Sequence, residues 1–502
     1  MLTNKTVLLG VTGSIAAYKA AELASKLTQA EAQVDVVMTK AATEFITPLT
    51  FRSITHRPVA TDMFATPTEY DIEHVALAER ADVVVIAPAT ANIIAKLAAG
   101  IADDMLCCTI LATKAPIILA PAMNVNMYEN PITQDNLAKL RSRGFNIIEP
   151  AYGALACGEV GMGRLADIEH ILATVYQVLG REGDLAGKHV IVTAGGTQEP
   201  IDPVRHISNR GSGKMGYALA EAARDRGAKV TLISAPTALP TPMGVEMIQV
   251  QTALQMREAV LKAAPKADAL IMAAAVADYR PATTAESKLK KEAAPRLKLE
   301  LIRNPDILSE VEGGLIRVGF AAESENLIQN ATAKLKEKCL DLIVANDITV
   351  TDSGFDADTN KVVLIDRQGN KQDLPLLPKS EVAHRVLDKV MELLHKRSGN
   401  KLPEIIEITL TRTEREHYQR INIPKDKRGL FPKDEVRFVL ETDMGKIKKA
   451  YVYQGHDQYD QDHIHGGGEL KEWFRCHREL KDGDKLIIEV IEPMKRYRLK
   501  IG

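Results

Sequence analysis

The sequence lacks an excess of charge of either sign, a CxxC pair and any long uninterrupted apolar run. Its 64 lysine and arginine residues nearly balance 66 aspartate and glutamate residues, which argues against a nucleic acid or a membrane surface as partner of the whole chain. Five cysteines without CxxC spacing argue against a disulfide framework or a zinc site, and favour a reducing, cytoplasmic location. Because no stretch of about 18 apolar residues is present, no membrane span is expected.

The 502 residues are too many for one core, and about 150 residues per domain suggest roughly three domains. Polar linkers at residues 181–188 and 396–403 divide the chain. We therefore predict domains at residues 1–183, 184–398 and 399–502.

Apolar strands alternate with helical stretches in the first two of these segments. The expected strands are residues 6–11, 34–38, 83–87 and 116–120 in the first, and 189–194, 230–234, 269–274, 317–320 and 342–345 in the second. This rhythm predicts an α/β fold with two doubly wound, Rossmann-like parallel sheets. The third segment has strand-like runs with one helix near residues 469–477, which predicts a small β-barrel-like domain.

The first strand leads into a glycine turn, residues 10–15, that opens a helix. Glycines let the backbone approach a phosphate, and the free N–H groups at a helix start bind the anion. A dinucleotide fold places an acidic residue at the end of the second strand, where this chain has Thr39 and Lys40. A hydroxyl and a cation suit a phosphate better than a ribose, so a mononucleotide is favoured over NAD.

Four further motifs follow in the same segment: His74, the run 88–93, the run 121–128 and the glycine-spaced run 155–165 with Cys157. Each alone has an ordinary structural explanation, such as a turn or a core histidine. Together they resemble the flavin-containing cysteine decarboxylases, specifically phosphopantothenoylcysteine decarboxylase, over nearly all of residues 1–180. One departure is Tyr128, where the family often has Trp, but an aromatic side chain remains and no loss of activity is expected.

The resemblance implies that FMN takes two electrons from the cysteine moiety of the substrate, so that the carboxylate leaves as carbon dioxide, and then returns them. His74 would act as base or orienting group, Asn124 would hydrogen-bond the departing carboxylate, and Cys157 would donate the final proton. The implied FMN contacts are Gly13, Ser14, Ile15, Thr39, Phe45, Ala89, Thr90, Ala91 and Asn92.

The second segment has its own glycine turn at residues 195–196. Gly213 and Lys214 suggest a P-loop, but Met215 and Asn209 stand where that motif requires Ser or Thr and Gly. Residues 202–216 instead resemble the phosphopantothenate–cysteine ligase signature, with Asn209 in the key position, and the likeness spans about 188–395.

The ligase resemblance implies that 4′-phosphopantothenate attacks the α-phosphate of CTP, and that L-cysteine then attacks the acyl cytidylate and releases CMP. Positioned cations and Mg²⁺ would supply most of the catalysis, although the metal ligands remain unassigned. Asn209 and Lys288 would be catalytic, and Arg205 would bind the substrate phosphate. The implied nucleotide contacts are Ala273, Ala274, Asp278, Lys288, Asn304, Pro305, Asp306, Ile307, Phe320, Lys334 and Lys338. By themselves, the lysines could equally be surface charge.

Together the two halves resemble the bifunctional enzymes of coenzyme A biosynthesis. That resemblance further implies a homo-oligomer, with trimeric decarboxylase contacts and dimeric ligase contacts that can combine into a dodecamer. A peptide-cysteine decarboxylase is the competing enzyme class, but it leaves the ligase-like half unexplained.

The third segment is not needed by either activity. A loop there carries polar residues that could bind a metal, although a flexible polar loop is the simpler interpretation: His456, Asp457, Asp460, Asp462, His463 and His465. Residues 428–432, 473–475 and 480–486 look like the small β-barrel modules of plant B3 and restriction-enzyme DNA-binding domains. A DNA-binding module and a structural appendage are both open.

Overall fold

The computed structural model describes residues 2–63, 73–156, 158–290, 298–323, 325–347 and 357–397, and then 405–409, 420–423, 425–432, 436–442, 445–453, 463–465, 467–477, 480–481, 484–492 and 496–501. Cys157, His456, Asp457, Asp460 and Asp462 lie outside these residues. The chain divides into two compact units, Met1–Met391 and Glu392–Gly502. Within the described ranges, no helix combines the length and apolar composition that a membrane crossing requires.

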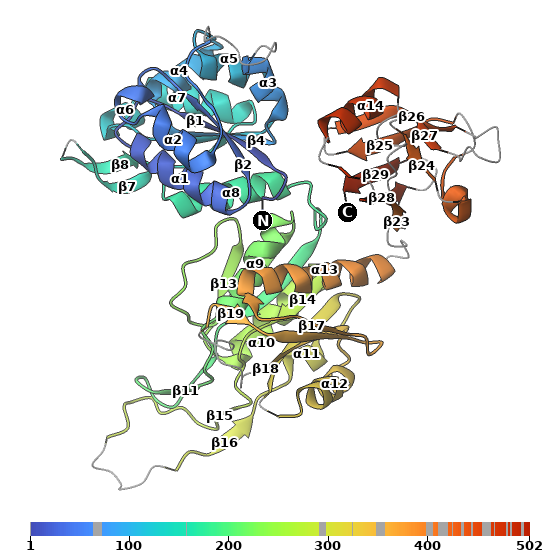
Figure 1. Ribbon diagram of the computed structural model, residues 1–502. Helices are drawn as coiled ribbons and strands as arrows, with labels where there is room; N and C mark the ends of the chain where they lie inside the picture. The colour runs from blue at the N-terminus through green and yellow to red at the C-terminus, as the bar shows by residue number, and fades with distance from the viewer. Residues whose placement is uncertain are drawn as a thin grey trace. The chain divides into compact units, whose positions relative to one another are not determined.

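A six-stranded sheet in the order β3-β2-β1-β4-β5-β6 organises the first 180 residues (Figure 1). Its strands are β1 (Thr6–Val11), β2 (Gln33–Met38), β3 (Val59–Ala60), β4 (Val83–Ala89), β5 (Ile117–Pro121) and β6 (Asn146–Ile147). Every described pairing is parallel. Strands of a parallel sheet are buried on both faces, which explains the unbroken apolar run of β4. The order reverses between β1 and β4 and opens a crevice at their carboxyl ends.

Helices cover both faces of this sheet. They are α1 (Ala17–Gln29), α2 (Pro48–Thr55), α3 (Glu73–Arg80), α4 (Ala91–Ala99), α5 (Met105–Ala112), α6 (Val125–Glu129), α7 (Pro131–Ser142) and α8 (Ile168–Gly180), with a 3-10 turn η1 (Ala42–Glu44). α1, α2 and α8 pack into one core, and α3, α4, α5 and α7 into the other. A hairpin of β7 (Ala151–Ala154) and β8 (Val160–Arg164) precedes α8. The prediction of a doubly wound parallel sheet is confirmed here.

An eight-stranded sheet in the order β13-β12-β9-β14-β17-β18-β20-β21 organises the second segment. Its strands are β9 (His189–Ala194), β12 (Lys229–Ser234), β13 (Glu246–Gln249), β14 (Ala269–Met272), β17 (Ile316–Glu323), β18 (Leu342–Asp347), β20 (Val362–Asp366) and β21 (Lys371–Asp373). The strands from β13 to β18 are parallel, and the order reverses between β9 and β14. However, β20 and β21 are antiparallel, so the prediction of a wholly parallel sheet is wrong at this edge. The connection 367–370 is short and has Gly369 at φ +86°, so it joins β21 to β20 as an antiparallel hairpin, because parallel strands need a long crossover.

The helices of this segment are α9 (Lys214–Asp225), α10 (Ala253–Ala263), α11 (Ile307–Glu310), α12 (Leu327–Glu337) and α13 (Lys379–Arg397), with a 3-10 turn η2 (Ala264–Lys266). Three short antiparallel pairs supplement the main sheet: β10 (Gln198–Pro200) with β11 (His206–Ser208), β15 (Tyr279–Pro281) with β16 (Leu301–Arg303), and β19 (Thr359–Asn360) with β22 (Leu377–Pro378). The third pair leads the chain directly into α13.

The C-terminal unit is β-rich, as predicted, with a sheet in the order β23-β28-β29-β25-β26-β27-β24. Its elements are β23 (Ile405–Thr409), β24 (Ile421–Asn422), η5 (Lys425–Leu430), β25 (Phe438–Thr442), β26 (Gly445–Tyr453), β27 (His463–His465), α14 (Gly467–Cys476), β28 (Lys485–Glu492) and β29 (Arg496–Ile501). Aliphatic and aromatic side chains share the core, where Phe431 stacks on Tyr497 with centroids 4.6 Å apart. Among the described strands the order is open, with β23 and β24 at its edges, so the barrel-like form is not confirmed.

Candidate active sites at two sheet edges

A cavity of about 520 Å³ lies at the carboxyl ends of β1, β2, β4 and β5, in the crevice where the strand order reverses. The predicted FMN contacts that line it are Gly13, Ser14, Thr39, Thr90, Ala91 and Asn92. The other lining residues are Thr12, Lys40, Ala41, Ile93, Lys96, Asp104, Ala122, Met123 and Met127. Three predicted contacts are not among the residues that line it: Ile15 and Phe45, which are exposed to solvent, and Ala89, which is buried inside the sheet.

Thr12, which the sequence did not single out, joins the turn after β1 to the turn after β4. Its hydroxyl donates to the Pro88 carbonyl at 2.7 Å and accepts from the Thr90 N–H at 3.1 Å. Thr90 in turn is the N-cap of α4. Beside Thr12, a Cβ atom at Gly13 would lie 2.5 Å from Cβ of Ala41, so only glycine fits. This wall of the cavity is therefore built from backbone and hydroxyl groups, which suit a phosphate or a sugar.

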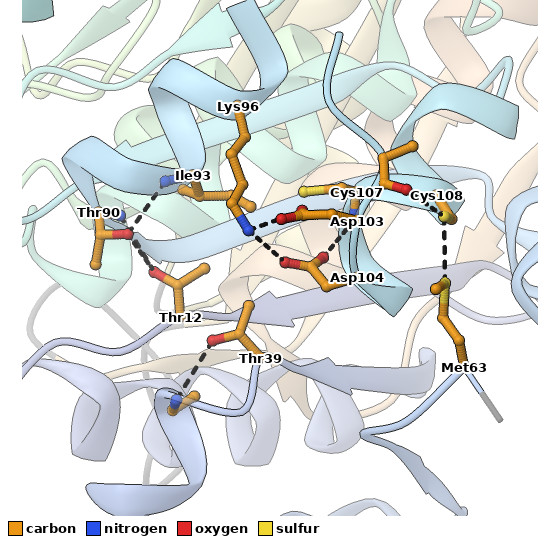
Figure 2. Close-up of polar contacts among 12 residues, drawn as sticks. Thr12, Thr39, Met63, Thr90, Ile93, Lys96, Asp103, Asp104, Cys107 and Cys108 are labelled. Atoms are coloured by element: carbon orange, nitrogen blue, oxygen red, sulfur yellow. Dashed lines mark hydrogen bonds and ion pairs between the residues drawn. The ribbon is translucent and has the colours of Figure 1, made fainter. Parts of the chain in front are cut away.

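Figure 2 shows a charged cluster that no sequence motif marks, and two of its members, Lys96 and Asp104, line the same cavity. Nζ of Lys96 donates to Asp103 at 2.8 Å and to Asp104 at 3.2 Å, and the bond to Asp103 raises the pKa of Lys96. Asp104 also accepts from the Cys107 N–H at 2.8 Å as N-cap of α5. A possible metal ligand atom of each of Asp103, Asp104 and Cys107 lies within 4.8 Å of the others. Burial raises the pKa of the Cys107 thiol to about 12, however, so it stays protonated and is a poor ligand.

Asn124 lies between this cavity and the β7–β8 hairpin. Its Oδ1 accepts from the Asn126 N–H at 2.8 Å as N-cap of α6, and its Nδ2 donates to Oε2 of Glu159 at 2.7 Å. The hairpin packs directly on the same loop, because the Met123 N–H donates to the Gly163 carbonyl at 2.9 Å. The structure therefore brings the predicted carboxylate-binding asparagine and the glycine-spaced segment together.

His74 is half-buried near the start of α3 and is not among the described residues that line the cavity. Cys157 lies outside the described residues, so its predicted role stays a prediction. Tyr128, where the family often has Trp, is buried and donates its hydroxyl to Glu149. Burial also raises the pKa of Tyr128 to about 12, so this hydroxyl remains a donor at neutral pH.

A second cavity, of about 490 Å³, lies at the carboxyl ends of β9, β14, β17 and β18. The predicted ligase residues that line it are Asn209, Ala273, Ala274, Asp278, Phe320 and Lys334. The other lining residues are Gly195, Arg210, Gly211, Ser212, Gly213, Lys214, Met215, Gly216, Ala275, Val276, Ala321, Ala322, Asn346, Asn360 and Lys379. Asn209 and Val276 both line the cavity, and Nδ2 of Asn209 donates to the Val276 carbonyl at 3.0 Å.

Lysines from three helices converge on this second cavity: Lys214 from α9, Lys334 from α12 and Lys379 from α13. Nζ of Lys214 pairs with Asp358 at 2.7 Å, and this hydrogen bond lowers the pKa of Asp358. Lys379 is buried, and its Nζ donates to the Ala357 carbonyl at 2.6 Å. Convergent cations of this kind suit a polyphosphate. No sequence motif marks Lys379, and Lys214 lies within the ligase-like signature 202–216 but was not assigned a role there.

The predicted nucleotide contacts 304–307 and Lys338 do not line the cavity. Asn304 is buried, and its N–H donates to the Asp278 carbonyl at 2.8 Å. Asp306 pairs with Lys338 at 3.0 Å, and Ile307 is part of the hydrophobic core. In this structure these residues support the loop that carries Asp278.

Arg205 and Lys288 come together away from the cavity lining. Nη1 of Arg205 contacts Asp202 at 3.1 Å and the Leu289 carbonyl at 3.2 Å. Lys288, next to Leu289, is exposed. The two predicted residues therefore lie on the segments that carry the β10–β11 and β15–β16 pairs.

Known proteins match both cavity-bearing segments. The family model Flavoprotein matches residues 1–180, and the model DNA/pantothenate metabolism flavoprotein C-terminal domain matches residues 185–394. The Coenzyme A biosynthesis bifunctional protein CoaBC of Bacillus subtilis (strain 168) is 47% identical over 407 residues, which cover 80% of this chain and 100% of the relative. CoaBC of Mycobacterium bovis (strain ATCC BAA-935 / AF2122/97) is 44% identical over 408 residues, covering 78% and 97%.

A crystal structure of the C-terminal domain of a Coenzyme A biosynthesis bifunctional protein CoaBC is 41% identical, covers 43% of this chain and 99% of that one, and has a TM-score of 0.37. The family matches end at residue 394. They therefore lend no support to the DNA-binding alternative for residues 399–502.

Proposed function

This chain belongs to the family of coenzyme A biosynthesis bifunctional proteins, which combine a flavoprotein decarboxylase with a phosphopantothenate–cysteine ligase, and from this premise we propose how its two cavities divide the work. Residues 184–398 join L-cysteine to 4′-phosphopantothenate with CTP, through an acyl cytidylate. Residues 1–183 then decarboxylate 4′-phosphopantothenoylcysteine to 4′-phosphopantetheine. The observation that carries the proposal is that each matched segment has a cavity where its own sheet reverses order, and that about half a dozen residues of its motifs line each cavity.

The donor set of the first cavity fits FMN as its flavin. Hydroxyls of Thr12, Thr39 and Thr90 and the close backbone at Gly13 suit a phosphate and a ribityl chain, and Lys40 adds a cation. A second nucleotide is disfavoured, because β2 is followed by Thr39 and Lys40 and not by an acidic residue that would bind its ribose. When bound, FMN supplies the reversible two-electron chemistry that makes the substrate carboxylate able to leave.

The protein side chains bind the substrate and handle its protons. Nδ2 of Asn124 donates to the departing carboxylate, and its fixed orientation as the N-cap of α6 supports this role. Cys157 donates the final proton, and His74 acts as base or orienting group. The last two roles rest on the family resemblance.

In the second cavity, cationic side chains stabilise the phosphoryl oxygens on which charge accumulates. Lys214, Lys334 and Lys379 surround the position proposed for the triphosphate. Asp278 is the acidic side chain among the described lining residues, and it is exposed. Mg²⁺ is commonly held by one or two carboxylates together with substrate phosphates, so Asp278 would hold the ion in the ligase reaction.

A homo-oligomer is part of the proposal, with trimeric contacts through the decarboxylase segment. Large apolar side chains are exposed at the start of α1 and along η1 and α2: Ile15, Tyr18, Phe45 and Leu49. α1 and α2 contact each other, so these side chains share one region. Exposed apolar groups gathered in this way mark interaction surfaces.

The experiment that tests the function incubates the FMN-loaded protein with 4′-phosphopantothenate, L-cysteine, CTP and Mg²⁺. Pyrophosphate, CMP, carbon dioxide and 4′-phosphopantetheine are expected in equal amounts. Omission of CTP should abolish all four. If 4′-phosphopantothenoylcysteine is then supplied, carbon dioxide and 4′-phosphopantetheine should form without pyrophosphate or CMP. Purified protein that neither retains nor recruits a flavin would contradict the decarboxylase half.

A further inference from the structure

We propose that Glu159 occupies the carboxylate-binding amide of Asn124 until the carboxylate of the substrate replaces it. This inference rests on the decarboxylase function proposed for residues 1–183. Its basis is the 2.7 Å hydrogen bond from Nδ2 of Asn124 to Oε2 of Glu159. A carboxylate of the protein thus lies on the donor that the reaction assigns to a carboxylate of the substrate.

The amide of Asn124 is oriented for this exchange. Its Oδ1 already accepts the N–H of Asn126 at 2.8 Å, which turns the Nδ2 group toward Glu159. Two carboxylates placed side by side on one amide group would repel each other. Glu159 and the substrate carboxylate are therefore competitors for Asn124.

The fold brings Glu159 to this position through the glycines of β8. A Cβ atom at Gly161 would lie 2.7 Å from Cγ2 of Val125, so β8 packs against the first residue of α6 without an intervening side chain. At the turn end of the hairpin, the Leu155 N–H donates to the Glu159 carbonyl at 2.8 Å. Glu159 directly precedes β8, so its backbone is anchored on both sides while its side chain reaches Asn124.

Competition of this kind lowers the apparent affinity for ligands that carry the carboxylate. The apparent dissociation constant equals the intrinsic one divided by the fraction of molecules whose Asn124 is available. With Asn124 available in about one molecule in five, the loss is about fivefold, which corresponds to about 1 kcal/mol. A ligand without the carboxylate makes no use of Asn124 and escapes this loss. After carbon dioxide leaves, the product no longer has a carboxylate to hold Asn124. Glu159 then returns to Asn124, so the site distinguishes the substrate from the product.

The test compares two unreactive ligands that differ only in the carboxylate: 4′-phosphopantothenoyl-alanine and the N-ethyl amide of 4′-phosphopantothenate. Binding to the FMN-loaded full-length protein is followed through the flavin absorbance, which reports on the decarboxylase half alone. Glu159→Ala is expected to lower the dissociation constant of the alanine adduct about fivefold, and Glu159→Gln, which keeps a neutral acceptor oxygen, should lower it by a smaller factor. The affinity for the ethyl amide should not change. Glu129→Gln removes an exposed charge from α6 and should alter neither ligand.

Each other outcome has a definite meaning. If both Glu159 variants bind the alanine adduct as the unmodified protein does, or shift both ligands alike, Glu159 has only a structural role and the inference is overturned. If the unmodified FMN-loaded protein binds neither ligand and releases no carbon dioxide from 4′-phosphopantothenoylcysteine, the decarboxylase function itself fails. The two failures are therefore distinguishable.

Discussion

Replacing Gly163 by alanine is expected to disable decarboxylation and leave ligation intact. Gly163 has φ +147°, a region that side-chain-bearing residues rarely adopt, and its added Cβ would lie 2.2 Å from the Met123 carbonyl oxygen. Because non-bonded heavy atoms are most favourable near 3.5 Å, the hairpin and the loop before α6 must separate by about 1 Å. Asn124 lies on that loop and Glu159 on that hairpin, so their spacing changes with it.

A shift of this size has a large effect on a positioned reaction. Misplacement of a reacting group by about 1 Å costs about a hundredfold in rate. We therefore expect kcat/KM for carbon dioxide release from 4′-phosphopantothenoylcysteine to fall about a hundredfold. Pyrophosphate release from CTP, 4′-phosphopantothenate and L-cysteine gives an internal reference in the same preparation, and it should not change.

Gly158→Ala is the matched control. Gly158 also has a positive φ, +87°, but an added Cβ there meets nothing within 4 Å. This variant therefore carries only the conformational cost of about 1–2 kcal/mol, without the displacement of the Asn124 loop. A Gly163→Ala protein that retains its flavin and decarboxylates as well as Gly158→Ala would refute the reasoning.

Three further variants test other parts of the chain. Cys157→Ser should release carbon dioxide but form little 4′-phosphopantetheine, and normal turnover by chromatographic product analysis would exclude Cys157 as proton donor. Lys379→Gln removes a buried cation from the ligase cavity, so KM for CTP should rise about tenfold, with decarboxylation of supplied substrate as the unaffected control. Trp473→Ala should destabilise the C-terminal unit by about 3–5 kcal/mol, seen as a lower calorimetric melting transition. Both activities should survive it, and their loss would show that this unit supports them.

The sequence was sufficient for most of the fold because buried parallel strands have a simple signature. The run at residues 83–87 is an unbroken apolar stretch and the run at 189–194 is mostly apolar, and both became central strands within two residues of their expected ends. The edge at β20 and β21 was missed. β21 pairs antiparallel with β20 because a short turn around Gly369 joins them. The alternation of strands and helices along the sequence does not predict this turn.

The candidate sites were only partly predictable, because a cavity is a tertiary property. Gly13 and Thr90 were found through motifs, but Thr12 was not, since its value lies in a hydrogen bond across 78 positions of the chain. Lys379 enters the ligase cavity only because its helix starts beside the ends of other strands. Conversely, Ile307 belongs to a family motif yet lies in the core. Membership of a motif therefore does not distinguish a residue that lines the cavity from one that supports it.

Both halves of the chain pair a side chain proposed to bind an anion with a carboxylate of the protein. Asn124 donates to Glu159, and Lys214 pairs with Asp358. The second carboxylate is far more exposed than its lysine, at 89% against 34%, and an exposed ion pair contributes little to stability. On the proposed function, a triphosphate near Lys214 would therefore replace a weak partner and add charge from several oxygens at once. Ligand binding at Asn124 and at Lys214 would then be an exchange of partners, so that neither side chain lacks a carboxylate partner before the ligand arrives.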